Sequence, residues 1–87
     1  MIGRSYEILI EPAARRSLSK LPRDVQARLV ARMELLKTDP RPHGSTKLTG
    51  HEAYRVRVGD YRIIYAILDA RLLILIVDVG NRRDVYR

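Results

Sequence analysis

The sequence predicts an α+β fold in the chain order β-α-α-β-β-β. An N-terminal strand and an antiparallel pair of helices precede a mainly antiparallel β-meander, and the helices cover one face of the sheet. Three observations predict it. Residues 54–65 alternate between apolar and charged side chains around a Gly-Asp pair, which is typical of a β-hairpin. Residues 12–37 repeat apolar side chains at helical spacing, and residues 72–79 are apolar at nearly every position. A chain of 87 residues forms a single domain, residues 1–87.

The first half of the chain is expected to form one strand and a helical hairpin. Tyr6–Ile10 is rich in β-favouring residues and forms the strand. Pro12 fits the first turn of a helix, where its missing N–H has no partner to lose, and this helix runs to about Lys20. A second helix covers Pro22–Lys37, and the short link makes the two helices antiparallel neighbours on one sheet face. The apolar stripe of the second helix consists of Val25, Leu29, Met33 and Leu36.

Thr38–Thr46 is expected to be the one long loop, because its prolines and glycine fit no regular element. Arg41 and His43 could contact a ligand from this loop. A lone histidine in a loop is more often simply exposed. On the preceding helix, Arg28, Arg32 and Glu34 lie away from the apolar stripe and are interpreted as a solvated face rather than an RNA surface.

A two-residue loop at Gly59-Asp60 fixes which residues face each other in the predicted hairpin. Arg57 then lies opposite Arg62, and because side chains alternate between the two faces, Arg55 shares their face. The other face holds Tyr54, Val56, Ile63 and Tyr65. Like charges directly opposed across two strands are destabilising, so this arrangement favours an anionic partner such as RNA. The alternative is a solvated face on which the arginines lie over apolar neighbours.

The last strand, Leu72–Val79, follows a turn at Asp69-Ala70 and is apolar on both faces, so we expect it inside the sheet. Asp78, at the end of this strand, is expected to cap it or to pair locally. The final residues, 80–87, are too polar for the core.

The composition favours a polyanionic partner. The formal charge is +7, and fourteen of the seventeen basic residues are arginines, whose forked guanidinium suits phosphate contacts. A GC-rich coding bias would also enrich arginine. There is no cysteine, and two histidines eight positions apart do not suggest a metal site, so no metal and no cofactor are expected. No apolar run reaches the roughly 18 residues of a membrane span, so we expect a cytoplasmic protein with no membrane partner.

The residues present suit one kind of chemistry. Neither a Ser-His-Asp order, nor paired carboxylates, nor a Gly-rich phosphate loop stands out. Arginines, tyrosines and a nearby lysine remain. Such a site suits metal-free RNA cleavage, in which the ribose 2′-hydroxyl attacks the adjacent phosphate and arginines stabilise the charge on the phosphoryl oxygens.

Four short motifs between Lys47 and Tyr86 carry a resemblance to a known family. They are Lys47-Leu48-x-Gly50, Tyr54-Arg55-x-Arg57, Gly59-x-Tyr61-Arg62-x-x-Tyr65, and Gly80-x-Arg82 followed by Tyr86. With the strand and helical hairpin before them, they resemble the RelE/ParE superfamily of type II toxin-antitoxin toxins, and more closely its RelE branch. The resemblance implies the RelE-like microbial RNase fold and a ribosome-dependent mRNA endonuclease, or mRNA interferase, that inhibits translation. It also implies a cognate antitoxin, contacts with the ribosome and mRNA, and operator DNA as a partner of the toxin-antitoxin complex.

The resemblance also implies roles for individual residues. Arg55 and Arg57 would lie beside the scissile phosphate, and Arg62 would stabilise it. Arg82 would stabilise the leaving group or act as a general acid, and Tyr86 would stack on a base. Further RNA contacts would come from Arg41, Arg83 and Arg87. We expect Arg62 and Arg82 to be exposed.

Two points stay open from the sequence. RelE toxins can have lysine where this chain has Arg55 and Arg57, and arginine is a poor general base. Lys47, His51, Glu52, Tyr86 or the ribosome could accept the proton, and His51 has the best-tuned pKa among them. The alternative functions are a ParE-like inhibitor of DNA gyrase that cleaves nothing and an inactive relative that acts as a binding module.

One face of the sheet is expected to need a partner. Ile64, Ala66 and Leu68 would share the face of the arginines, where the short chain offers no cover. An amphipathic segment of the antitoxin could bury these residues and neutralise the arginines.

Overall fold

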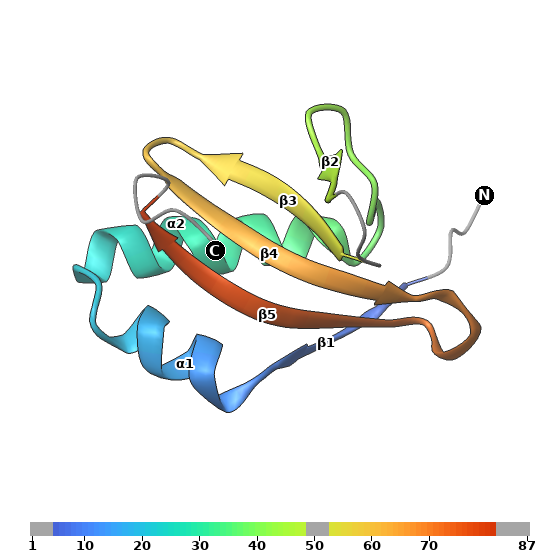
Figure 1. Cartoon of the computed structure of the whole chain (residues 1–87), viewed down its shortest axis with the longest axis horizontal. Coiled ribbons are helices and arrows are strands. Elements are labelled where there is room, and N and C mark those ends of the chain that lie inside the picture. Colours follow the sequence, from blue (N-terminus) through green and yellow to red (C-terminus); the bar gives the residue numbers. More distant parts are fainter. Residues whose placement is uncertain (1–4, 49–52, 82–87) are drawn as a thin grey trace.

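The computed structural model describes residues 5–48 and 53–81. It contains a five-stranded sheet in the order β1-β5-β4-β3-β2, with both helices on the same side of the sheet (Figure 1). The elements are β1 (Glu7–Ile10), α1 (Pro12–Ser19), α2 (Arg23–Leu36), β2 (Thr46–Lys47), β3 (Ala53–Val58), β4 (Tyr61–Leu68), a short 3-10 turn (Asp69–Arg71) and β5 (Leu73–Asn81). The predicted α+β class and element order are confirmed.

The two helices form where their apolar residues recur at helical spacing. Pro12 is the first residue of α1, and Ala14 and Leu18 are the buried residues of that helix. In α2 the buried residues are the four of the predicted stripe, Val25, Leu29, Met33 and Leu36. Both helices end within one residue of the predicted limits. They place one continuous apolar surface against the sheet.

The hairpin of β3 and β4 has the predicted register. Arg57 pairs with Arg62, and the two strands stay in register from Val58 and Tyr61 at the turn to Ala53 and Ala66 at the far end. Gly59 has φ +62°, which glycine adopts at little cost and which suits the first central position of a tight hairpin turn.

Two of the remaining strand pairings were not predicted. β5 lies inside the sheet and pairs with β4 antiparallel, as the meander predicts, but on its other side it pairs with β1 in parallel. The loop prediction was too long, because Thr46 pairs with Arg55 and Lys47 pairs with Tyr54 in the short strand β2. The pairing of β1 with β5 joins segments that are distant in the sequence, and β2 is only two residues long, so local periodicity carries no signal for either.

A β-bulge interrupts the pairing of β4 with β5. Ile64 pairs with Asp78 and Tyr65 pairs with Ile76, so Val77 has no partner on β4. Before the bulge, Ile74 and Ile76 of β5 face the core, whereas after it the odd-numbered residues do. Val79 therefore points into the core, and Asp78 points to the face away from the helices.

The core lies between the helices and the sheet, and Tyr65 is its largest fully buried side chain. The Tyr65 hydroxyl donates a hydrogen bond of 2.7 Å to the carbonyl oxygen of Pro40, which ties the loop after α2 to the centre of the sheet. Burial raises the pKa of Tyr65 to about 12. The ring of Tyr54 stacks on Tyr65 with 6.0 Å between centroids.

Tyr65→Phe is expected to lower the free energy of unfolding by about 1 kcal/mol at pH 7, because the Pro40 carbonyl loses its donor. In the wild type, Tyr65 stays protonated in the folded chain to about pH 12, whereas in the unfolded chain it ionises from about pH 10. Its contribution is therefore complete below pH 10 and is lost as the pH rises towards 12. Urea unfolding at pH 7, 9, 10 and 11 should show that the difference in unfolding free energy between the wild type and Tyr65→Phe becomes smaller above pH 10. A difference that stays constant over this range would contradict this account.

Candidate active site on the outer face of the sheet

Arg55, Arg57 and Arg62 lie on the outer face of the sheet, which is the face opposite the helices, as the register predicts. Their exposure differs. Arg57 is exposed, Arg55 is half-buried and Arg62 is buried, with 6% of its surface accessible. The expectation that Arg62 is exposed is therefore wrong.

Arg62 is buried because its guanidinium bonds to β5. Nη1 donates to the carbonyl oxygen of Asn81 at 2.5 Å, and Nη2 donates to Oδ2 of Asp78 at 3.3 Å. Asp78 therefore pairs across the sheet rather than locally. This contact also supplies the negative charge that two opposed arginines require. The opposition of Arg57 and Arg62 is thus relieved within the chain and does not by itself call for RNA.

Arg41 lies at the other end of β3 and takes part in a separate cluster. Its Nη2 lies 2.8 Å from Oδ2 of Asp69, and its Nε donates to the hydroxyl of Tyr54 at 3.1 Å. Tyr6 donates to Oδ1 of the same carboxylate at 2.6 Å. Hydrogen bonds from Arg41 and Tyr6 lower the pKa of Asp69, and the bond to Asp69 raises the pKa of Tyr6. We call these four residues the Arg41 clasp. The Arg41 guanidinium therefore has partners within the chain, although its side chain is 45% exposed.

The other predicted residues do not join the three arginines in the described structure. Lys47 pairs with Tyr54, so its side chain leaves the sheet on the side of the helices. His43 is exposed in its loop. The predicted site residues that lie outside the described ranges are His51, Glu52, Arg82, Arg83, Tyr86 and Arg87.

The outer face also carries apolar side chains, but they are less exposed to solvent than expected. Ile64 is buried, with 2% of its surface accessible, so the expectation that it lacks cover is wrong. Ala66 and Leu68 are half-buried. Across the sheet, Ala66 pairs with Leu75 and Leu75 pairs with Leu9, whose side chain is 53% exposed. A partly open apolar band therefore crosses the outer face beside the arginines.

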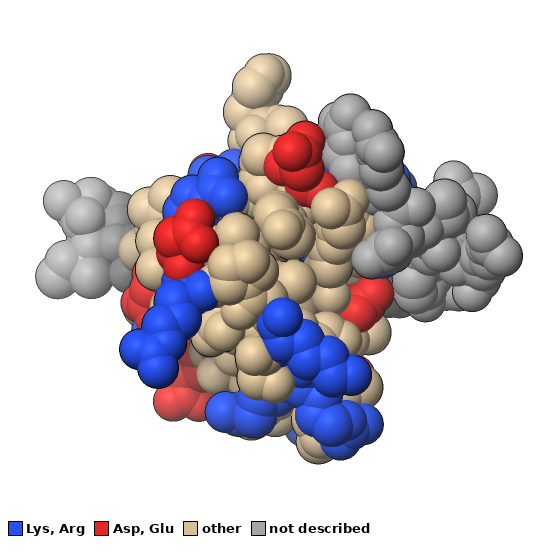
Figure 2. Space-filling model, turned by 90° about the vertical axis from the view of Figure 1, so that its left-hand side faces the viewer, with Lys and Arg blue, Asp and Glu red and all other residues tan. Residues whose placement is uncertain are grey.

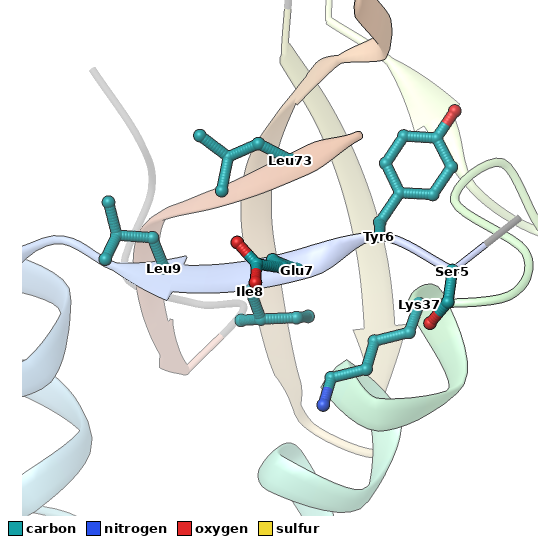
Figure 3. A pocket seen from close by; sticks show the side chains of 7 residues that line it. All are labelled: Ser5, Tyr6, Glu7, Ile8, Leu9, Lys37 and Leu73. Carbon is teal, nitrogen blue, oxygen red and sulfur yellow. The ribbon is translucent and has the colours of Figure 1, made fainter. Parts of the chain in front are cut away.

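A hollow of about 610 Å³ lies along β1, at the edge of the sheet furthest from β3 and its arginines. It is lined by Ser5, Tyr6, Glu7, Ile8, Leu9, Lys37 and Leu73 (Figure 3). The ammonium group of Lys37 is 3.0 Å from a carboxylate oxygen of Glu34, so this cation already has a partner. The hollow brings together no set of side chains with the chemistry expected of a catalytic site.

The helical side of the molecule carries further basic residues. α1, α2 and the link between them expose Arg15, Arg16, Lys20, Arg23 and Arg28. Figure 2 shows the end where the helices meet and β3 turns into β4, with a group of basic side chains below the centre and acidic ones around it. The guanidinium of Arg28 lies over the hairpin turn, 3.4 Å from the position that a Cβ would take at Gly59. The expected solvated position of Arg28 is confirmed, whereas Arg32 is half-buried.

Within residues 5–48 and 53–81, no group of three or more His, Cys, Asp or Glu side chains is placed to hold a metal ion. Nor does a helix in the described chain have the length and apolar character needed to cross a membrane.

A model of the family described as "ParE toxin of type II toxin-antitoxin system, parDE" matches residues 8–86. The chain belongs to the RelE/ParE superfamily of type II toxins. An Escherichia coli protein described as a RelE-like toxin is 30% identical to this toxin, over 93% of this chain and 90% of that protein.

Solved structures of RelE toxins share the fold. The RelBE2 toxin-antitoxin complex of Mycobacterium tuberculosis includes a chain that is 28% identical, with a TM-score of 0.83 over 93% of this toxin and 95% of that chain. The RelE-RelB complex of Pyrococcus horikoshii OT3 gives 26% identity and a TM-score of 0.78 over 93% and 99%. The RelE-like fold expected from the motifs is confirmed.

The Arg62 contact with Asp78 should be measurable as an energetic coupling. Arg62→Ala is expected to cost about 2 kcal/mol of unfolding free energy, less than for a fully buried pair, because the Asp78 side chain is 31% exposed. The Arg62→Ala/Asp78→Ala double variant should be less destabilised than the sum of the single variants by about 1 kcal/mol. Arg57→Ala is the matched control and should stay within about 0.5 kcal/mol of the wild type. If denaturant unfolding shows that the free-energy change of the double variant equals the sum of the two single changes, the pair does not form.

Proposed function

We propose that this toxin is a ribosome-dependent mRNA endonuclease that inhibits translation. The observation that carries the proposal is the exposed guanidinium of Arg57 on the outer face, beside Arg55 on the same strand. Within the described residues, neither side chain forms an ion pair. Both can therefore contact a phosphate without giving up an internal partner.

The chemistry requires little of the protein beyond charge and position. The ribose 2′-hydroxyl attacks the adjacent phosphorus, the bond to the 5′ oxygen breaks, and a 2′,3′-cyclic phosphate and a 5′-hydroxyl result. Arg55 and Arg57 stabilise the negative charge that develops on the phosphoryl oxygens. In this proposal, Arg82 assists the leaving oxygen and Tyr86 stacks on a base.

The proton of the 2′-hydroxyl must go to another group, because arginine stays protonated. Lys47 is a poor candidate, since its side chain leaves the sheet on the face opposite the arginines. His51, Glu52, Tyr86 and the ribosome remain as candidates. Histidine is the side chain whose ordinary charge change lies nearest neutral pH, which makes His51 the first of these candidates to test.

A second candidate function is inhibition of DNA gyrase without cleavage of RNA. The match of a ParE toxin family model over residues 8–86 favours it. The two functions require different properties of the outer face. A nuclease needs the Arg57 guanidinium for catalysis, whereas a gyrase inhibitor needs only a surface that binds protein.

Induction of this toxin, followed within minutes by mapping of transcript 5′ ends, should reveal breaks in phase with codons inside translated regions. Arg57→Ala should reduce these breaks about 10- to 100-fold, because one stabilising charge is lost at the phosphate. Arg16→Ala removes an exposed arginine from α1 and serves as the matched control that keeps full cleavage. Intact messages together with double-strand breaks in DNA would identify the gyrase inhibitor instead.

We also propose that a cognate antitoxin covers the apolar band of the outer face, and that the toxin-antitoxin complex binds operator DNA. Relatives of this toxin form complexes with RelB antitoxins. An amphipathic segment with acidic residues would bury the band and neutralise the neighbouring arginines.

Leu9→Lys is expected to weaken antitoxin binding at least about tenfold, because it places a charge in the band that the antitoxin would bury. Leu35→Lys is the control, since Leu35 is 59% exposed on α2, on the other side of the sheet. Isothermal titration of each purified toxin with antitoxin provides the measurement. Equal affinities for the two variants would exclude the band as the binding surface.

A further inference from the structure

The bulge in β5 decides what Arg62 contacts. From Ile76, regular alternation would place Asp78 on the side of the helices, in the apolar core. The additional residue, Val77, reverses this phase, so that Asp78 lies opposite Ile64 on the outer face. A carboxylate that would otherwise disrupt the core reaches the guanidinium of Arg62 instead.

The next residue on this face of β5 is Gly80, which pairs with Arg62. The guanidinium packs against it, since a Cβ at Gly80 would lie at an ordinary contact distance of 3.5 Å from Nη1 of Arg62. Arg62 extends over Gly80 to the carbonyl oxygen of Asn81. The carboxylate of Asp78 and the carbonyl oxygen of Asn81 together hold the side chain of Arg62 against β5.

This arrangement separates two arginines that the hairpin places directly opposite each other. Arg57 and Arg62 have paired Cα positions, which in antiparallel strands are about 4.5–5.5 Å apart. Arg62 is fixed on the β5 side, and Arg57 remains exposed on β3. The two bonds to β5 use two of the five N–H groups of the Arg62 guanidinium.

We propose that Asp78 is a positioning residue that holds the Arg62 guanidinium at one side of the scissile phosphate while Arg57 approaches from the other. The inference rests on the proposed endonuclease function. A fixed cation needs no reorganisation when charge develops on the phosphoryl oxygens, so its stabilisation is specific to the transition state. Fold stability alone does not require this pair, because apolar residues can often replace a buried ion pair without loss.

The test compares Asp78→Asn, Asp78→Glu and the wild type in the cleavage of mRNA on programmed 70S ribosomes. Asparagine keeps the size of the side chain but removes its charge. It should lower kcat about 10- to 100-fold, as expected when a catalytic group is misplaced by about 1 Å, and change KM less than about threefold. Asp78→Glu restores the carboxylate and should recover part of kcat. Asp39→Asn, the same chemical change in an exposed loop, is the control and should match the wild type.

Each variant is assayed at a temperature well below its thermal unfolding midpoint. A smaller fraction of folded protein then cannot be mistaken for a lower kcat. If Asp78→Asn unfolds more easily but cleaves at the wild-type rate, Asp78 only stabilises the fold and the inference is overturned. It is overturned as well if Asp78→Glu recovers nothing beyond Asp78→Asn. If the wild type leaves ribosome-bound mRNA intact, the proposed function fails, and the inference fails with it.

Discussion

The tight turn at Gly59 and Asp60 sets the register of β3 against β4, and the two faces of the sheet follow from it. Because the turn has two residues, each side chain on β3 is matched with one on β4, and alternation then sorts them by face. Apolar residues face the helices, and the three arginines lie on the outer face. A shift by one residue would bring Arg57 into the core, so the apolar face and the turn hold the arginines in place together.

Two arginines of the outer face, Arg62 and Arg57, lie in different environments. Arg62 is bonded to β5 and mostly removed from solvent, and its contact with Asp78 offsets the repulsion between opposed arginines. Arg57 keeps its charge exposed. One guanidinium is therefore fixed in position by β5, and the other extends from β3 into solvent. This difference within a single hairpin is the structural basis for treating Arg62 as the fixed cation and Arg57 as the exposed one.

The two ends of the β3–β4 hairpin serve different purposes. At the turn, the arginines lie on the outer face, and Gly80 is in contact with Arg62. At the far end, the Arg41 clasp links the loop after α2 to β3, to the turn before β5 and to the residue before β1. Tyr65 anchors the same loop through Pro40. The clasp therefore stabilises the framework on which the arginines are displayed, and its own arginine is used for that purpose.

The sequence by itself determined the elements whose cause is local. Helical spacing located α1 and α2, and alternation around a Gly-Asp turn gave the hairpin register and the shared face of Arg55, Arg57 and Arg62. Both patterns repeat over a few residues, so they can be read without knowledge of the rest of the chain.

Only the tertiary structure decided which of these arginines is bonded within the fold. The burial of Arg62 depends on a bulge at Val77, which no periodic pattern marks and which changes the face of Asp78. The engagement of Arg41 depends on Asp69, 28 residues away in the chain, and the parallel pairing of β1 with β5 joins segments even further apart. Contacts of this kind arise from the packing of distant segments, and a local sequence pattern contains no information about them.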